Sequence, residues 1–191
     1  MNRNTSVARY RRVDLCLFAL MLLVFESIII AASNRWFPGS AYTVSLTPAI
    51  TAIVLVRWGP WAGVHAVLGA LVLCIGSGAS PVHYAVYCLG NLFALAVLPC
   101  FRFGGGVREA NRTSGRTVLL GLAVLMLMQA GRAMIALGTG AALPAAAGFF
   151  TTEVITDLFT LILLWIVRRL DGILEDQRHY LRRIRDEEDN R

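Results

Sequence analysis

The chain has 191 residues, of which 57% are hydrophobic and only 16% are charged, and its formal net charge is +6. This composition excludes an ordinary soluble domain, which needs a charged surface to stay in water. The sequence instead predicts an all-α integral membrane protein with six transmembrane helices, because a membrane leaves few other ways to satisfy the backbone.

Six apolar stretches follow one another along the chain, and each approaches the roughly 20 residues that a helix needs to cross the hydrocarbon core. The second and third are short and are separated only by a tight turn. The stretches cover about 13–33, 40–57, 60–77, 82–101, 117–139 and 146–168. They predict a single transmembrane domain over residues 13–168, preceded by a basic cytoplasmic tail over residues 1–12.

The arginines define the expected topology. All 18 basic residues are Arg, and all but two of them lie before the first stretch, between the second and third, between the fourth and fifth, or from the end of the sixth onward. The two exceptions are Arg35 and Arg132. Because cytoplasmic loops carry the arginine excess, the chain is predicted to be a multi-pass protein of the cell membrane with both termini in the cytoplasm. This distribution accounts for the positive charge without a nucleic-acid partner.

Residues 169–191 are predicted to form a charged, amphipathic cytoplasmic helix. Its apolar stripe recurs at alternating spacings of four and three residues. The stripe consists of Leu170, Leu174, Gln177, Leu181 and Ile184. Three interpretations stay open: contact with a partner, contact with the membrane surface, or a solvated extension of the last helix.

The four cysteines form neither a CxxC pair nor a Cys/His cluster with metal-ligand spacing. They are interpreted as small apolar residues within or beside the spans. They are Cys16, Cys74, Cys88 and Cys100. No metal and no cofactor is expected.

Polar side chains within the stretches gather at one depth, in the outer half of the membrane. Because ionisable residues in spans usually face a water-filled cavity, this pattern predicts a substrate pocket open to the outside. The candidate binding residues are Glu26, Tyr84, Tyr87, Asn91, Gln129, Arg132, Glu153 and Asp157. Among them, Tyr84, Tyr87 and Asn91 share one helix face by their spacing.

Acids outnumber bases in this candidate pocket. Glu26, Glu153 and Asp157 stand against Arg132 alone. One acid is expected to pair with Arg132, and the remainder must be protonated, hydrated or matched by a ligand. A small ligand with a cationic or hydrogen-bond-donating group would match them. Two alternatives stay open: the acids form a structural ion-pair network, or Arg132 holds a ligand carboxylate.

His65 lies apart from these residues, one turn into the third stretch from the cytoplasmic end. Two interpretations are open for it. It is either a packed histidine that is hydrogen-bonded across helices, or a residue that couples the protein to proton movement.

The third stretch and the turn before it read RWGPWAGVHAVLGALVLCIGSG over residues 57–78. Ala62, Ala66 and Ala70 form a ladder of small residues, which lets helix backbones approach closely in a membrane. The turn over 59–63, followed by small residues, resembles the helix 2–3 junction of the substrate-binding S components of energy-coupling factor (ECF) vitamin transporters. The chain is also similar to that family in its length, its six spans, its cytoplasmic termini and its polar cluster in the outer half of the membrane.

The resemblance implies a non-enzymatic subunit that captures a small vitamin-like or cationic heterocyclic molecule from the outside. It also implies a transmembrane T component and two cytoplasmic ABC-type ATPases as partners. The pocket would be formed by helices 4–6 and the external loops. Ala62, Ala66 and Ala70 would then form the contact face for the T component.

Two other classes of protein remain open. A rod-shape-type scaffold protein of the cell envelope has a similar size and span number, but would not need an acidic outer pocket. An intramembrane enzyme is less favoured, because His65 lies at a different depth from the acids and no EExxxR, HExxH or GxSxG motif occurs. A proton-coupled carrier fits poorly, because the chain shows no internal repeat.

Overall fold

The computed structural model describes residues 3–38, 44–100, 113–170, 172–177 and 180, without the side chains of residues 3–6 and 100. Within these ranges every regular element is a helix. Five stretches are long and apolar enough to cross a membrane: Val7–Trp36, Thr47–Gly76, Pro81–Pro99, Ser114–Gly138 and Leu143–Val167. The predicted all-α fold is confirmed, and the composition of these stretches is that of a multi-pass membrane protein.

The apolar stretches predicted from the sequence all contain helices, although some are divided. The elements are α1 (Arg3–Trp36), α2 (Thr47–Trp58), η1 (Gly59–Trp61), α3 (Ala62–Gly76), α4 (Pro81–Asn91), η2 (Leu92–Ala96), α5 (Val97–Cys100), α6 (Ser114–Gly138), α7 (Leu143–Thr151) and α8 (Val154–Val167). The 3₁₀ turns η1 and η2 join neighbouring α-helices directly. The last predicted stretch is divided into α7 and α8 by Thr152 and Glu153.

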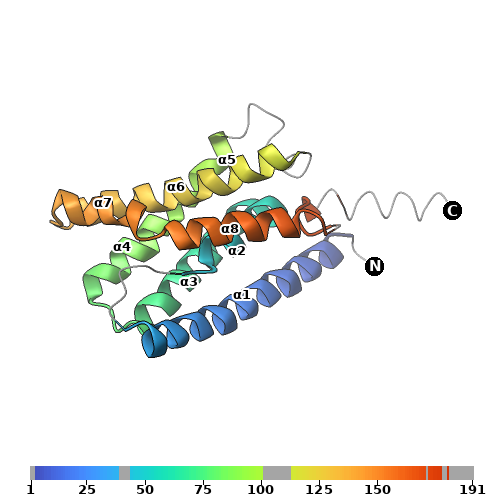
Figure 1. Ribbon diagram of the computed structural model, residues 1–191. Helices are drawn as coiled ribbons and strands as arrows, with labels where there is room; N and C mark the ends of the chain where they lie inside the picture. Colours follow the sequence, from blue (N-terminus) through green and yellow to red (C-terminus); the bar gives the residue numbers. More distant parts are fainter. Residues whose placement is uncertain (1–2, 39–43, 101–112, 171, 178–179, 181–191) are drawn as a thin grey trace.

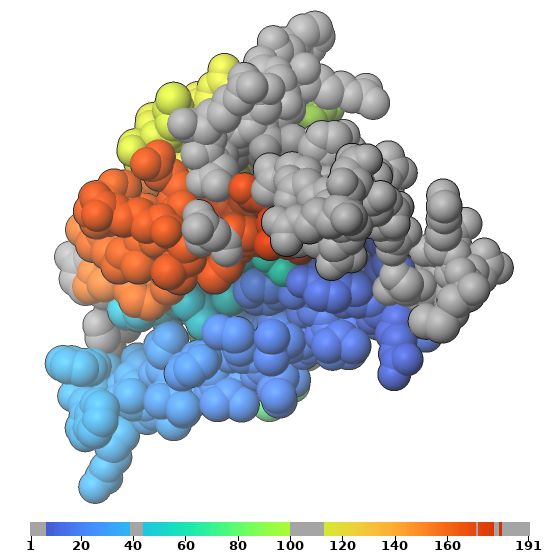
Figure 2. Space-filling view, turned by 90° about the vertical axis from the view of Figure 1, so that its right-hand side faces the viewer, coloured from blue at the N-terminus to red at the C-terminus, as the bar shows by residue number. Residues whose placement is uncertain are grey.

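α2 is the central helix of the bundle. All twelve of its residues are buried, and it contacts α1, α3, α6 and α8. A helix that is apolar nearly all round is suited to such an interior position. Figure 1 shows α1 on one flank and α6 on the other, with α2, α3 and α8 between them. In Figure 2, α1 and α8 form separate ridges of the surface, and part of the α2–α3 segment is visible between them.

α2 and α3 form an antiparallel hairpin. Gly59 caps α2 with φ of 63°, a left-handed conformation that glycine adopts without steric cost, and Pro60 follows it. A Cβ atom added to Gly69 would overlap the Thr47 side chain, so the start of α2 lies against the second half of α3. The 30-residue stretch Thr47–Gly76 is therefore folded back on itself as helices of 12 and 15 residues.

Hydrogen bonds between the helices mark the two ends of the bundle, which we call the inner end and the outer end. At the inner end, Arg57 at the end of α2 donates hydrogen bonds to Asp14 on α1 and to the carbonyl of Gly172 after α8. The Asn34 side chain near the end of α1 donates to the carbonyl of Gly76, the last residue of α3, which defines the outer end. The predicted topology places the inner end on the cytoplasmic side.

α4 and α6 cross at two glycines. A Cβ atom on Gly90 would lie 2.6 Å from the backbone nitrogen of Arg132, and one on Gly131 would overlap the Gly90 carbonyl oxygen. Close backbone approach at small residues is the usual way to pack helices in a membrane. The crossing brings Tyr87 and Asn91 of α4 beside Arg132 of α6.

The small-residue ladder of α3 lies inside the chain. Ala62, Ala66 and Ala70 are 0%, 0% and 1% exposed, and α3 packs against α1, α2 and α4. Their small side chains allow these internal helices to approach closely. The structure thus corrects the expectation that the three alanines offer a contact face to a T component, because their surface is already covered by the chain itself.

Over its described residues, the chain directly after α8 is not a regular continuation of that helix. α8 ends at Val167, residues 168–170 and 172–175 form turns and bends, and Gly172 has φ of 77°. Leu174 and Gln177 of the predicted stripe are buried in the chain. Leu181 and Ile184 lie outside the described residues, as does most of the predicted loop between the fourth and fifth stretches.

Candidate functional site

Arg132 on α6 is the centre of the polar cluster and is 3% exposed. Its Nη1 pairs with Glu153 Oε1, and its Nε donates to Asn91 Oδ1 at 2.7 Å. The guanidinium carbon lies 5.0 Å from the centroid of the Tyr87 ring. Asn91 Nδ2 donates in turn to the Ala66 carbonyl at 3.1 Å. These contacts tie α6 to α3, to α4 and to the junction of α7 and α8.

Glu153 is buried at the break between α7 and α8. Thr152 ends α7, and its hydroxyl donates to the Gly148 carbonyl at 2.9 Å. Glu153 is the N-cap residue of α8, but its side chain makes no capping hydrogen bond and pairs with Arg132 instead. This break was not predicted, since the apolar stretch over 146–168 was expected to form one helix through both residues. The prediction that one acid pairs with Arg132 is confirmed.

Gln129 and Asp157 form a second pair, one turn along α6 and α8 from the first. Gln129 Nε2 donates to Asp157 Oδ1 at 2.8 Å. Gln129 is 1% exposed, and its Oε1 has no hydrogen-bond partner in the described part of the chain. Asp157 is half-buried, and this is its one hydrogen bond to another side chain within the described ranges. The hydrogen-bond partner of the Asp157 carboxylate is thus neutral, and the positive charge of Arg132 acts on it without an ion pair.

Glu26 on α1 is fully buried but does not contact Arg132 directly. Its Oε1 accepts from the Ser45 hydroxyl at 2.6 Å, and its Oε2 accepts from the Leu46 backbone N–H at 2.8 Å. The Ser45 backbone N–H donates to Thr156 Oγ1 on α8 at 3.1 Å. Glu26 therefore fixes the segment that leads into α2 between α1 and α8, as expected of a buried carboxylate supplied with donors.

The eight predicted binding residues thus separate into groups. Tyr87, Asn91, Arg132 and Glu153 are in direct contact, Gln129 and Asp157 form the neighbouring pair, and Glu26 binds its own partners. Tyr84 is half-buried one turn before Tyr87 and makes no hydrogen bond or ion pair with the described residues.

An aromatic contact beside the cluster was not predicted. The Phe149 ring on α7 meets the Tyr87 ring edge to face, with centroids 5.8 Å apart. Phe149 lies in an apolar run whose pattern predicts insertion into the membrane but no specific contact. Its role depends on α7 packing against α6, which the sequence alone does not specify.

A surface groove of about 350 Å³ opens between α1 and α3 near the outer end. Ile30, Asn34, Val72 and Ile75 are among its lining residues. None of the eight predicted binding residues lines it. The groove is therefore separate from the Arg132 cluster.

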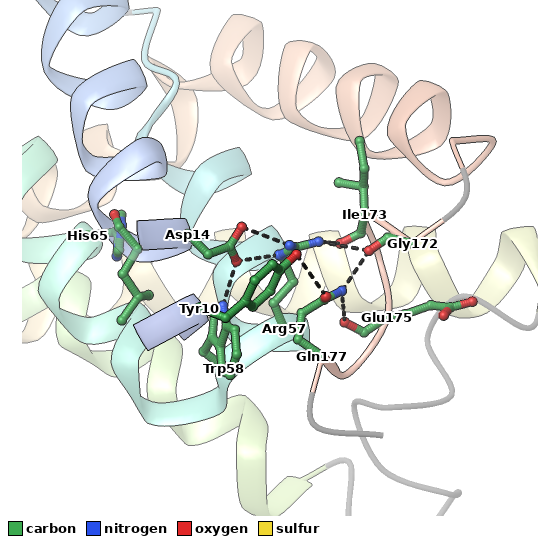
Figure 3. Close-up of polar contacts among 10 residues, drawn as sticks. Tyr10, Asp14, Arg57, Trp58, His65, Gly172, Ile173, Glu175 and Gln177 are labelled. Atoms are coloured by element: carbon green, nitrogen blue, oxygen red, sulfur yellow. Dashed lines mark hydrogen bonds and ion pairs between the residues drawn. The ribbon is translucent and has the colours of Figure 1, made fainter. Parts of the chain in front are cut away.

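A second polar cluster lies at the inner end and was not predicted, because a lone Arg57 after an apolar stretch indicates topology and no partner. Arg57 Nε and Nη2 donate to the two carboxylate oxygens of Asp14 at 2.9 and 2.8 Å. Its Nη1 donates to the carbonyls of Gly172 and Ile173 at 2.8 and 3.0 Å. Trp58 Nε1 donates to Asp14 Oδ2 at 2.6 Å. Figure 3 shows these side chains converging from three segments of the chain.

His65 lies next to this inner cluster and is 2% exposed. Its Nε2 is 3.1 Å from the Leu15 carbonyl on α1, which requires the Nε2 proton for a hydrogen bond. Its Nδ1 has no partner among the residues that the structure describes. This contact is the one expected of a packed histidine bonded across helices.

Comparison with protein-family models, curated proteins and solved structures finds no match for this chain. Its function is therefore inferred from its own residues. Within the described ranges, no group of three His, Cys, Asp or Glu side chains is placed to hold a metal ion. The Arg132 cluster and the adjoining Gln129–Asp157 pair offer acceptor groups and aromatic faces, which suit binding of a small polar molecule.

Proposed function

We propose that the protein is the substrate-binding subunit of an importer of the ECF kind in the cell membrane. It captures a small cationic or donor-rich molecule, such as a vitamin-like heterocycle, from the outside. In this proposal α2 and α3 cross the membrane separately, which gives six spans with both termini in the cytoplasm. A transmembrane T component and two ABC ATPases are the partners, and they contact surfaces other than the buried alanines of α3.

The Gln129–Asp157 pair is the observation that carries the proposal. A half-buried carboxylate within a span, with an amide as its hydrogen-bonded side-chain partner, is costly unless a cation or a donor joins it. The buried Gln129 Oε1 adds a second acceptor without a partner among the described residues. A ligand with an ammonium, amidine or amino group would supply donors to both oxygens.

The surroundings of this pair support a cyclic ligand. Tyr87 and Phe149 present aromatic rings beside Arg132, and aromatic faces bind flat rings and cations. The break between α7 and α8 supports a binding role as well, because interrupted helices commonly form substrate sites in membrane transporters.

The proposal is tested by purifying the tagged full-length chain from its host in mild detergent. Mass spectrometry then identifies both the proteins and the small molecules that accompany it. We expect a T-type membrane protein, two ABC ATPases and a bound basic or amino-substituted molecule. Asp157→Asn should remove the small molecule while leaving the proteins in place.

Glu26→Gln is the matched control, because Glu26 is an intramembrane acid whose two oxygens are already bonded within the chain. It should lower thermal stability but keep the small molecule. A chain that purifies alone and empty would contradict the proposal. So would retention of the small molecule by Asp157→Asn at the level of the unmodified chain.

A non-enzymatic scaffold protein of the cell envelope is the second candidate. The observation in its favour is that Arg132, Glu153 and Asn91 already bond one another, as a purely structural network would. Recovery with envelope or division proteins, without ATPases, would support it. The Gln129–Asp157 pair would then be a helix-helix contact between α6 and α8.

A further inference from the structure

The segment that follows α8 is attached to the inner end of the bundle by α1 and α2. We propose that residues 172–177 form a latch that closes this end, and that the Asp14–Arg57 ion pair holds the latch in place. Release of the pair would free the latch and open the inner end of the bundle. This inference does not depend on the proposed transport function.

Arg57 on α2 makes the shorter hydrogen bonds to the latch, and the Tyr10 hydroxyl on α1 donates a longer one, 3.5 Å, to Gln177 Oε1. Arg57 is 6% exposed, and its bidentate pairing with Asp14 fixes the plane of the guanidinium group. In that orientation Nη1 reaches the carbonyls of both Gly172 and Ile173. Asp14 does not touch the latch itself but orients the residue that does. Figure 3 shows Arg57 between the Asp14 carboxylate and the two carbonyls.

The latch also covers the interior of the bundle. Leu174 is 0% exposed and belongs to the same apolar core as Phe18 and Trp58. Gln177 is 1% exposed, and its Nε2 donates to the carbonyls of Gly172 and Glu175 at 2.7 and 3.2 Å. These bonds hold the turn in the shape that inserts Leu174.

The position of the ion pair makes the latch sensitive to helix movement. Asp14 belongs to α1 and Arg57 to α2, whereas the carbonyls follow α8. A displacement of α1 relative to α2 would turn the guanidinium group away from the latch carbonyls. The segment has no regular helix of its own over 172–175, so a helical hydrogen-bond ladder does not hold it there.

Cysteine labelling of the full-length chain in inside-out membrane vesicles tests the latch. The four native cysteines are replaced, and Leu174→Cys or Leu170→Cys is introduced, because Leu170 is 50% exposed just outside the latch. Reaction with a membrane-impermeant maleimide is then timed. We expect Leu174→Cys to react at least about tenfold more slowly than Leu170→Cys, because buried positions react only after local opening.

Three variants should release the latch. Asp14→Asn and Arg57→Gln break the buried pair and should raise the labelling rate at position 174 by about tenfold or more. Gly172→Ala leaves the pair intact but strains the turn at φ of 77°, so it should raise the rate too. If Asp14→Asn or Arg57→Gln fails to fold, Gly172→Ala still tests whether a released latch exposes position 174.

Two controls should leave the rate at position 174 unchanged. Arg169→Gln removes an arginine that stacks on Trp165, with 4.2 Å from Cζ to the ring centroid. Gly115→Ala adds a methyl group that meets no atom of the described residues within 4 Å beyond its own helix backbone.

Two results would overturn the inference. One is labelling of Leu174→Cys as fast as Leu170→Cys in the unmodified background, which would mean that the segment does not close the inner end. The other is an unchanged labelling rate in Asp14→Asn and Arg57→Gln proteins that elute as folded species from a sizing column. In that case the pair does not hold the segment.

Discussion

Arg132 on α6 and Glu153, at the junction of α7 and α8, form an ion pair whose side chains are only 4% and 7% exposed. Asn91 and the Tyr87 ring complete the surroundings of the guanidinium group. A buried pair of this kind stabilises little compared with apolar residues, but losing one member leaves a buried charge uncompensated. The pair therefore makes Arg132 one of the residues that hold the junction of α7 and α8 against α6.

Single substitutions of this pair should cost more than the double substitution. We expect Arg132→Gln or Glu153→Gln to lower the free energy of unfolding by about 3–5 kcal/mol, because each strands the opposite charge. Arg132→Gln with Glu153→Gln should cost less than either one alone. Thermal unfolding in detergent measures all three. Additive losses in the double variant would show that the two side chains do not interact.

Gly131→Ala should destabilise the protein strongly. The added methyl group would overlap the Gly90 carbonyl, and a backbone atom cannot rotate away as a side chain can. We expect a loss of about 3 kcal/mol or more. Gly121→Ala should cost less, because its nearest neighbours are the flexible ends of Leu161 and Leu164.

Gly138→Ala is the matched control on the same helix, because the added methyl group meets no atom within 4 Å in the part of the chain that the structure describes, its own helix backbone aside. It should be neutral or stabilising by up to about 1 kcal/mol. Equal losses for Gly131→Ala and Gly138→Ala in a thermal unfolding assay would refute the close crossing of α4 and α6.

The folded-back hairpin of α2 and α3 predicts the sidedness of the α3–α4 turn. If the two helices cross separately, Ser77 lies outside, and Ser77→Cys in a cysteine-free chain should react with an impermeant maleimide in intact cells. Arg12→Cys, at the inner end of α1, should react only after the cells are opened. Protection of Ser77→Cys in intact cells would indicate that the whole segment Thr47–Gly76 makes a single crossing.

His65 is expected to tolerate substitution well. His65→Gln can keep a donor towards the Leu15 carbonyl, so it should change the free energy of unfolding by no more than about 1 kcal/mol. His65→Leu loses that hydrogen bond but also removes the buried Nδ1, so its cost should remain below about 2 kcal/mol. Loss of the proposed substrate binding in a stable His65→Gln protein would instead point to a proton-linked role.

Local patterns were sufficient to predict several features. Hydrophobic runs predicted helices in every apolar stretch, because a chain in lipid must satisfy its backbone internally. The spacing of Tyr87 and Asn91 placed them on one face, and both contact Arg132. An excess of acid over base predicted that one carboxylate pairs with Arg132, and Glu153 does.

Other features depended on contacts between distant segments. The break at Glu153 has no helix-breaking residue to mark it. The alanines of α3 are small enough for either an external or an internal contact, and only the neighbours α1, α2 and α4 decide that they are internal. The role of Asp14 required knowing that α1 passes beside Arg57.

The sequence by itself determined the class of the protein, the places where its chain is helical, and the set of polar residues that must find partners away from water. The tertiary structure decided which partner each one has: Glu153 for Arg132, Gln129 for Asp157, and Asp14 for Arg57. The physical reason is the separation along the chain between the residues that interact. Helix formation and membrane partition depend on neighbouring residues, whereas an ion pair depends on which helices pack together.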